Sequence, residues 1–145
     1  MSVRRAVLVL VSLAAASCAG DGSQLPDDMM GTPEPTLTWI QSNVFGQICV
    51  NCHVPGGAAE FMPLNTASAS FTSLVGQESV EVGPLLRVSP GDPDASYLVW
   101  KIEGQGPAGE PLVGERMPPP SAGEPALPDE QIAAIRQWIL DGAPP

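Results

Sequence analysis

The sequence is poor in several features that mark common classes of protein. Its longest apolar run is well short of the roughly 20 residues that cross a bilayer, which argues against a transmembrane helix. Six basic residues stand against 16 acidic ones, and such a surface repels nucleic acid. One histidine and three cysteines give few ligands for structural zinc. With 5% aromatic residues, 17 Pro and 15 Gly in 145 residues, a core of side chains alone would be thin, and the length suits one domain.

The N-terminal residues have the order of a secretory signal. Arg4 and Arg5 form a charged start, an apolar run extends from Ala6 to Ala16, and small residues follow. This pattern predicts a targeting segment over residues 1–17, which is removed from the mature protein and is not part of the fold.

Residues 15–18, Ala-Ala-Ser-Cys, resemble the lipobox of bacterial lipoproteins. The resemblance implies cleavage before Cys18, lipidation of that cysteine and a membrane anchor on the periplasmic side of the cell envelope. Residues 18–36 then form a flexible tether rich in Asp, Gly, Ser and Pro. Ala19 favours the outer membrane by the same resemblance. The alternative is an ordinary signal peptide with an incidental cysteine, which gives a soluble periplasmic protein.

Removal of the signal leaves a strongly acidic chain. Four basic residues remain against 16 acidic ones, a net charge of -12. This charge would attract partners with basic docking surfaces, and salt would weaken that attraction. The same excess of charge is also a simple means of staying soluble, and the sequence leaves both interpretations open.

Apolar periodicity predicts a mainly α fold over residues 37–145. A first helix is predicted over residues 36–49, with Thr38 and Gln41 as a capping box. Its apolar residues recur at helical spacing: Leu37, Ile40, Val44, Phe45 and Ile48. The helix would run directly into the Cys-Val-Asn-Cys-His motif at residues 49–53.

The middle of the chain gives weaker signals. A short helix is predicted over residues 67–75, and extended chain over residues 80–88. Asp92 and Pro93 suit the N-cap and first position of a helix that continues to Ile102.

A long irregular loop and a final helix are predicted for the C-terminal part. Residues 104–128 contain 7 Pro and 5 Gly and show no periodicity. Loops of this length in small domains are usually functional or disordered. An amphipathic helix follows, with Asp129 and Glu130 at its positive end, and ends at Asp141 and Gly142.

Cys49, Cys52 and His53 form the C-x-x-C-H signature of covalent haem attachment. Two thiols three residues apart lie on one side of a helical turn, where they can reach the two vinyl groups of a haem. The adjacent imidazole is then carried under the iron. The motif predicts one haem c, with thioether bonds to both cysteines and His53 as an axial ligand.

The motif has three other known uses. A structural zinc site normally has four Cys or His ligands, and the mature chain offers only these three residues and Cys18. A thioredoxin-like redox pair expects a βαβ setting that the pattern does not show. A disulfide between Cys49 and Cys52 is possible in an oxidising compartment, but so short a loop gains little from closure.

Met117 is the predicted second axial ligand. The chain has no second histidine, which leaves methionine as the natural donor. Met62 lies nine residues beyond His53, which leaves little chain to pass around a haem edge, whereas Met117 lies on the long loop before the last helix. We expect a backbone carbonyl near Pro63 to accept the ring N–H of His53. Trp100 could donate to a haem propionate, although a core role suits it better.

These features together resemble a small class I cytochrome c: Phe45 ahead of the haem motif, a late Met-Pro and an aromatic residue on the last helix. Residues 89–102, 116–119 and 135–143 further resemble the domains called planctomycete-type cytochrome c. In class I cytochromes the first and last helices cross and pack. The resemblance implies a cytochrome c-like fold around a covalent haem, with Val44 and Phe45 set against Ile135 and Trp138.

The resemblance implies one-electron transfer with His53 and Met117 both bound to iron. Such a protein makes no bonds on a substrate, so it is an electron carrier and not itself an enzyme. Two alternatives stay open. One is a haem-based peroxidase or gas sensor with an open site, and the other is a haem-free lipoprotein module with a Cys49–Cys52 disulfide.

Overall fold

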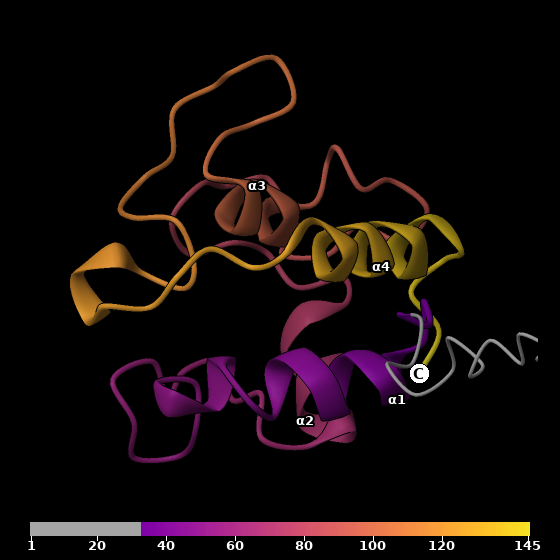
Figure 1. The fold of residues 1–145 in the computed structure, drawn as a ribbon. Coiled ribbons are helices and arrows are strands. Elements are labelled where there is room, and N and C mark those ends of the chain that lie inside the picture. The colour runs from indigo at the N-terminus through magenta and orange to yellow at the C-terminus, as the bar shows by residue number, and fades with distance from the viewer. Residues whose placement is uncertain (1–32) are drawn as a thin grey trace, which may run out of the picture. The chain divides into compact units, whose positions relative to one another are not determined.

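Helices are the regular elements of residues 33–145, the part of the chain that this computed structural model describes (Figure 1). In order they are α1 (Leu37–Ile40), η2 (Gln41–Phe45), η3 (Cys49–Asn51), α2 (Ala67–Leu74), α3 (Tyr97–Glu103), η4 (Pro120–Ala122) and α4 (Asp129–Leu140). β-Pairing within these residues is limited to isolated bridges. The predicted mainly α class is confirmed.

Some predictions concern the residues that precede residue 33. The signal peptide over residues 1–17, the lipidated Cys18 and most of the tether lie outside the described residues. Within residues 33–145, every helix is too short or too polar to cross a membrane.

The first helical segment differs from the single helix predicted over residues 36–49. After α1 the chain continues as the π-helix η2, in which the Gly46 N–H donates to the Gln41 carbonyl at 2.8 Å. A Cβ on Gly46 would lie 2.7 Å from that oxygen, so glycine permits the wider turn. The chain then turns, and the short 3₁₀-helix η3 begins at Cys49.

The predicted capping box is wrong. Thr36, not Thr38, caps α1 with its side chain. Gln41 does not reach back to the helix start, because its side-chain amide donates to the Leu64 carbonyl at 3.0 Å and accepts from the Ser70 hydroxyl at 2.7 Å. These two bonds tie the first helical segment to α2 and to the chain that precedes it.

α3 begins at Tyr97, four residues later than predicted. The Asp92 carboxylate accepts a backbone N–H three residues further on at 3.0 Å, so it caps a turn and not the helix itself. Ser96 is extended and pairs with Leu86 in a parallel bridge, which delays the start of α3. Extended chain was predicted over residues 80–88. The isolated bridges lie in the second half of this segment, at Leu86 and Val88, and the first half forms a bend.

Predictions for the remaining elements agree with the structure. α2 covers residues 67–74, and residues 104–128 form a loop whose one short helix within that span is η4. α4 has Asp129 and Glu130 in its first turn. The chain leaves α4 through Gly142, whose φ of 96° suits a residue without a side chain.

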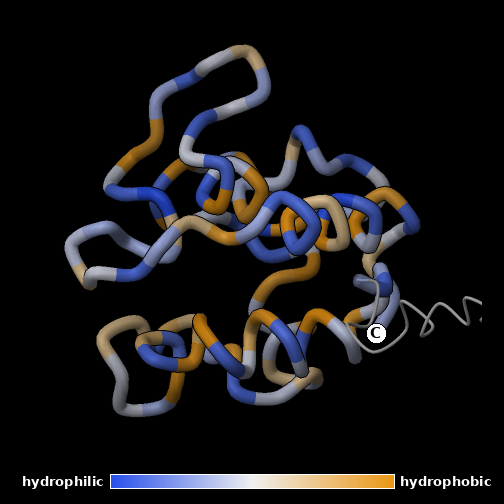
Figure 2. The backbone as a smooth tube through the Cα atoms, in the orientation of Figure 1, coloured by the Kyte–Doolittle hydropathy of each residue, from blue (hydrophilic) through white to orange (hydrophobic). Residues whose placement is uncertain are grey.

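The core joins the two ends of this unit. α4 contacts both α1 and α3, and Ile135 and Trp138 share one buried cluster with Val44 and Phe45. Figure 1 shows α1 and α2 in the lower half of the view and α3 and α4 in the upper half. Polar and apolar residues alternate along the helices in Figure 2, as expected for elements with one buried face.

Candidate cofactor-binding site

A cavity of about 380 Å³ lies among residues from η2, η3, α2, α3, α4 and the long loop. Pockets for cofactors usually measure about 300–1,000 Å³. Most of its lining is apolar and includes Val44, Phe45, Leu64, Leu98, Ile102 and Ile135. The cavity therefore has the size and the surface of a site for a largely hydrophobic molecule.

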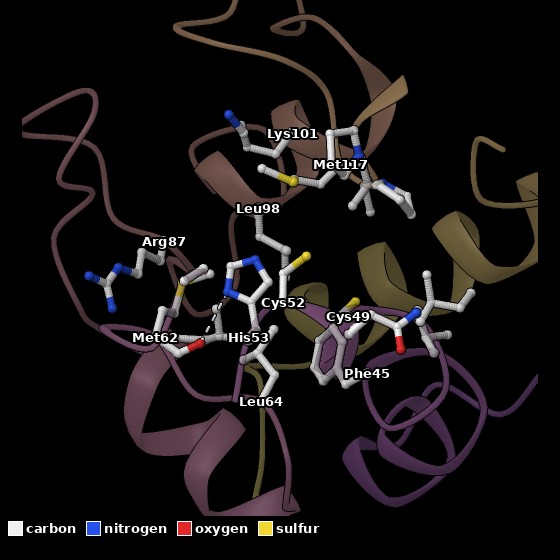
Figure 3. Close-up of a pocket in the computed structure, with 18 of the residues that line it drawn as sticks. Phe45, Cys49, Cys52, His53, Met62, Leu64, Arg87, Leu98, Lys101 and Met117 are labelled. Atoms are coloured by element: carbon white, nitrogen blue, oxygen red, sulfur yellow. Dashed lines mark hydrogen bonds between the residues drawn. The ribbon is translucent and has the colours of Figure 1, made fainter. Parts of the chain in front are cut away.

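The C-x-x-C-H motif forms one wall of this cavity. The Cys49 carbonyl accepts from the Cys52 N–H at 3.2 Å and from the His53 N–H at 2.9 Å, which winds the motif into a single turn. All three side chains line the cavity, and Figure 3 shows both sulfur atoms on the same side of the imidazole. The structure brings the three motif residues together as the sequence predicted.

Both motif cysteines are free thiols in this structure. Burial raises the pKa of Cys49 to about 12, and the neighbouring Cys52 adds to the shift. A catalytic C-x-x-C pair needs the opposite, a lowered thiol pKa that generates thiolate. The environment of Cys49 therefore does not favour a thioredoxin-like function.

His53 has a neutral imidazole that faces the cavity. Its side chain is buried, with 8% of the residue surface exposed, and burial lowers the pKa of the imidazole, with smaller effects from Arg87 and Lys101. Its Nδ1 lies 3.2 Å from the Met62 carbonyl oxygen. Because a carbonyl only accepts, the proton lies on Nδ1, and Nε2 is left with a free lone pair.

The hydrogen-bond acceptor for the His53 ring is a backbone carbonyl next to Pro63, as predicted. Met62 supplies its carbonyl in the peptide bond that leads into Pro63. In addition, the Leu64 N–H donates to the His53 carbonyl at 2.8 Å, which closes the loop between the two residues. Such an outer hydrogen bond fixes the ring orientation of a metal-binding histidine.

Met117 lines the same cavity from the long loop. Figure 3 shows its sulfur on the side of the His53 ring that carries the free nitrogen, with Leu98 between the two in this view. The Met117 N–H donates to the Lys101 carbonyl at 2.6 Å, which ties the loop to α3. The Arg116 guanidinium donates to the Pro118 carbonyl at 2.9 Å, and this bond spans Met117 within the loop.

Met62 also borders the cavity but occupies a different position. Its carbonyl is bonded to His53 Nδ1, so its backbone lies on the histidine side. Figure 3 shows its side chain beside Arg87, away from Met117. Of the two methionines among residues 33–145, Met117 is the one placed to face the free nitrogen of His53.

Sequence reasoning missed the charged residues at the cavity. Arg87, Lys101 and Glu81 all border it. The available signal was their rarity, since Arg87 and Lys101 are two of the four basic residues that follow Arg5 in the sequence. Trp100, considered as a donor to a propionate, instead donates its indole N–H to the Asp94 carbonyl at 2.7 Å.

Residues 33–145 contain no group of three or more His, Cys, Asp and Glu side chains that could hold a metal ion. The zinc site weighed from the sequence is therefore not formed by the motif within this unit. Comparison of the chain with protein families, with curated proteins and with solved structures finds no match. The interpretation of the site consequently depends on its own geometry.

The buried position of Cys49 predicts low reactivity in the haem-free protein. In a variant with Cys18 and Cys52 replaced by alanine, iodoacetamide should modify Cys49 at pH 8 about a thousandfold more slowly in buffer than in urea, because a pKa of about 12 leaves little thiolate. The rate in buffer should rise as the pH approaches 12. Equal rates in buffer and urea would show that the thiol is not buried.

Proposed function

We propose that residues 37–145 bind one haem c, attached through Cys49 and Cys52 and ligated by His53 and Met117, and that the protein transfers single electrons. The observation that carries this proposal is the placement of all four side chains around one apolar cavity. When bound, the haem iron supplies reversible one-electron oxidation and reduction. The resemblance to cytochrome c gives the same fold and function.

His53 and Met117 determine the kind of chemistry that the site supports. The carbonyl of Met62 holds the His53 proton on Nδ1, so Nε2 stays available as a donor to a metal. The thioether of Met117 is a neutral, soft donor that favours the reduced form of iron. If both side chains bind the iron, no position would be open for a substrate, and this favours electron transfer over a peroxidase or a gas sensor.

The apolar lining supports the same function. Phe45, Leu98 and Ile135 contribute to an apolar lining of the cavity, and an apolar environment limits the rearrangement of solvent that accompanies a change in charge. Phe61 is 60% exposed and Val80 is 70% exposed, and both border the cavity. The cavity therefore has an apolar rim in contact with solvent, where a redox partner can approach.

Covalent attachment is tested by expression in a bacterial host that carries the haem-maturation machinery. The purified protein should gain the mass of one haem, and its haemochrome spectrum should be that of a haem with two thioether bonds. A Cys49→Ala, Cys52→Ala variant, the control, should gain no covalent haem. Colourless wild-type protein with its two motif cysteines joined as a disulfide would favour the haem-free alternative.

The two methionines at the cavity give a matched pair for testing axial ligation. Met117→Ala should abolish the weak near-infrared sulfur-to-iron band of the oxidised protein and let carbon monoxide bind to the reduced protein. Met62→Ala should keep the band, because the carbonyl that bonds His53 belongs to the backbone and is retained in the variant. If Met117→Ala retains the band, Met117 is not a ligand.

We also propose that Cys18 is lipidated and anchors the protein in the cell envelope, with the haem domain on the periplasmic side. The lipobox-like residues 15–18 and the polar tether that follows support this. A Cys18→Ala variant should be recovered in the soluble periplasmic fraction, and the wild type in the membrane fraction. Membrane recovery of both proteins would contradict the lipid anchor.

A further inference from the structure

Two basic side chains border the cavity, and their surroundings differ. Lys101 is buried, with 9% of its side chain exposed, and its ammonium lies 2.9 Å from the Glu81 carboxylate. The Val113 carbonyl also accepts from it at 3.1 Å. The charge of Lys101 is therefore balanced by a carboxylate of the protein.

Arg87 has no such partner among residues 33–145. Its guanidinium donates to the Ser73 carbonyl at 2.7 Å and lies 5.9 Å from the centre of the Phe61 ring. The ion pairs of these residues involve Lys101 and Arg136 only. A guanidinium carries five N–H donors in a planar fork, so Arg87 has further donors besides the one that bonds the Ser73 carbonyl.

The position of Arg87 is fixed by the backbone on both sides. Its N–H donates to the Gln77 carbonyl at 2.6 Å, and its carbonyl accepts from the Leu98 N–H at 2.9 Å. The extended segment that contains it is thus held between the end of α2 and the start of α3. Arg87 is partly buried, and burial lowers the pKa of its guanidinium, which an anion beside it would oppose.

Arg87 and the motif cysteines lie on opposite sides of His53. Figure 3 shows Arg87 to the left of the imidazole, with its guanidinium at the outer end of the side chain, and Cys49 to the right of the imidazole. A haem carries its two propionate carboxylates away from the vinyl groups that react with cysteines. If the vinyl groups are at Cys49 and Cys52, a carboxylate edge can therefore face Arg87.

We infer that Arg87 binds a carboxylate of the cofactor at the edge of the cavity away from Cys49. This assignment rests on the proposed function. Its physical basis is the planar fork of arginine, which matches the two oxygens of a carboxylate and makes paired charge-assisted hydrogen bonds. Arg87 would be the basic side chain of the cavity whose charge is available for that purpose, since Lys101 is paired with Glu81.

The test measures the midpoint potential of the haem-loaded protein by optical redox titration. Arg87→Gln removes a positive charge beside a cofactor carboxylate, which favours the oxidised iron. At a fixed applied potential the ratio of reduced to oxidised protein should fall about tenfold, with the sulfur-to-iron band unchanged. Arg87→Lys keeps the charge and should retain most of the potential.

Arg136→Gln is the matched control, because Arg136 pairs with Asp94 and Glu103 and does not border the cavity. It removes the same charge and should change the ratio little. Equal effects of Arg87→Gln and Arg136→Gln would overturn the assignment while leaving haem attachment intact. Failure of the wild type to take up haem would instead overturn the proposed function.

A further measurement covers the case in which Arg87→Gln takes up no haem. The urea unfolding of the haem-free variant is then compared with that of the wild type. Lost haem uptake with unchanged unfolding supports a contact between Arg87 and the cofactor. Lost uptake together with lost folding shows that Arg87 acts through the Ser73 carbonyl as a structural residue, and overturns the assignment.

Discussion

The hydrogen bond from His53 Nδ1 to the Met62 carbonyl organises the candidate site. It determines which nitrogen carries the proton, and so which nitrogen faces the cavity. Together with the bond from the Leu64 N–H to the His53 carbonyl, it closes the loop that follows the motif. The backbone of Met62 is thereby held on the histidine side, which leaves Met117 as the sulfur across the cavity (Figure 3).

The sequence predicted the elements that depend on local patterns. The apolar spacing of α4 and the proline content of residues 104–128 were sufficient, and the C-x-x-C-H motif located three of the four proposed ligating or attaching residues. Met117 was found by elimination among the methionines. Its position opposite His53 depends on how the long loop packs on α3, which a periodicity does not encode.

The wrong predictions share a physical cause, since tertiary contacts overrode local preference. Gln41 was assigned to a capping box, but its amide is used by Leu64 and Ser70 across the fold. Asp92 suits an N-cap, yet the pairing of Ser96 with Leu86 keeps the chain extended until Tyr97. Arg87 was missed although basic residues are rare in this chain, because its proposed role depends on neighbours from distant segments, Ser73, Gln77 and Leu98.

Lys101 connects two parts of the cavity wall that are far apart in the sequence. Its backbone carbonyl accepts from the Met117 N–H, while its ammonium contacts Glu81. Lys101 of α3 thus bonds both the loop before α4 and the bend after α2. A shift of α3 would move both segments together. The distance between Met117 and His53 is therefore coupled to the position of this one helix.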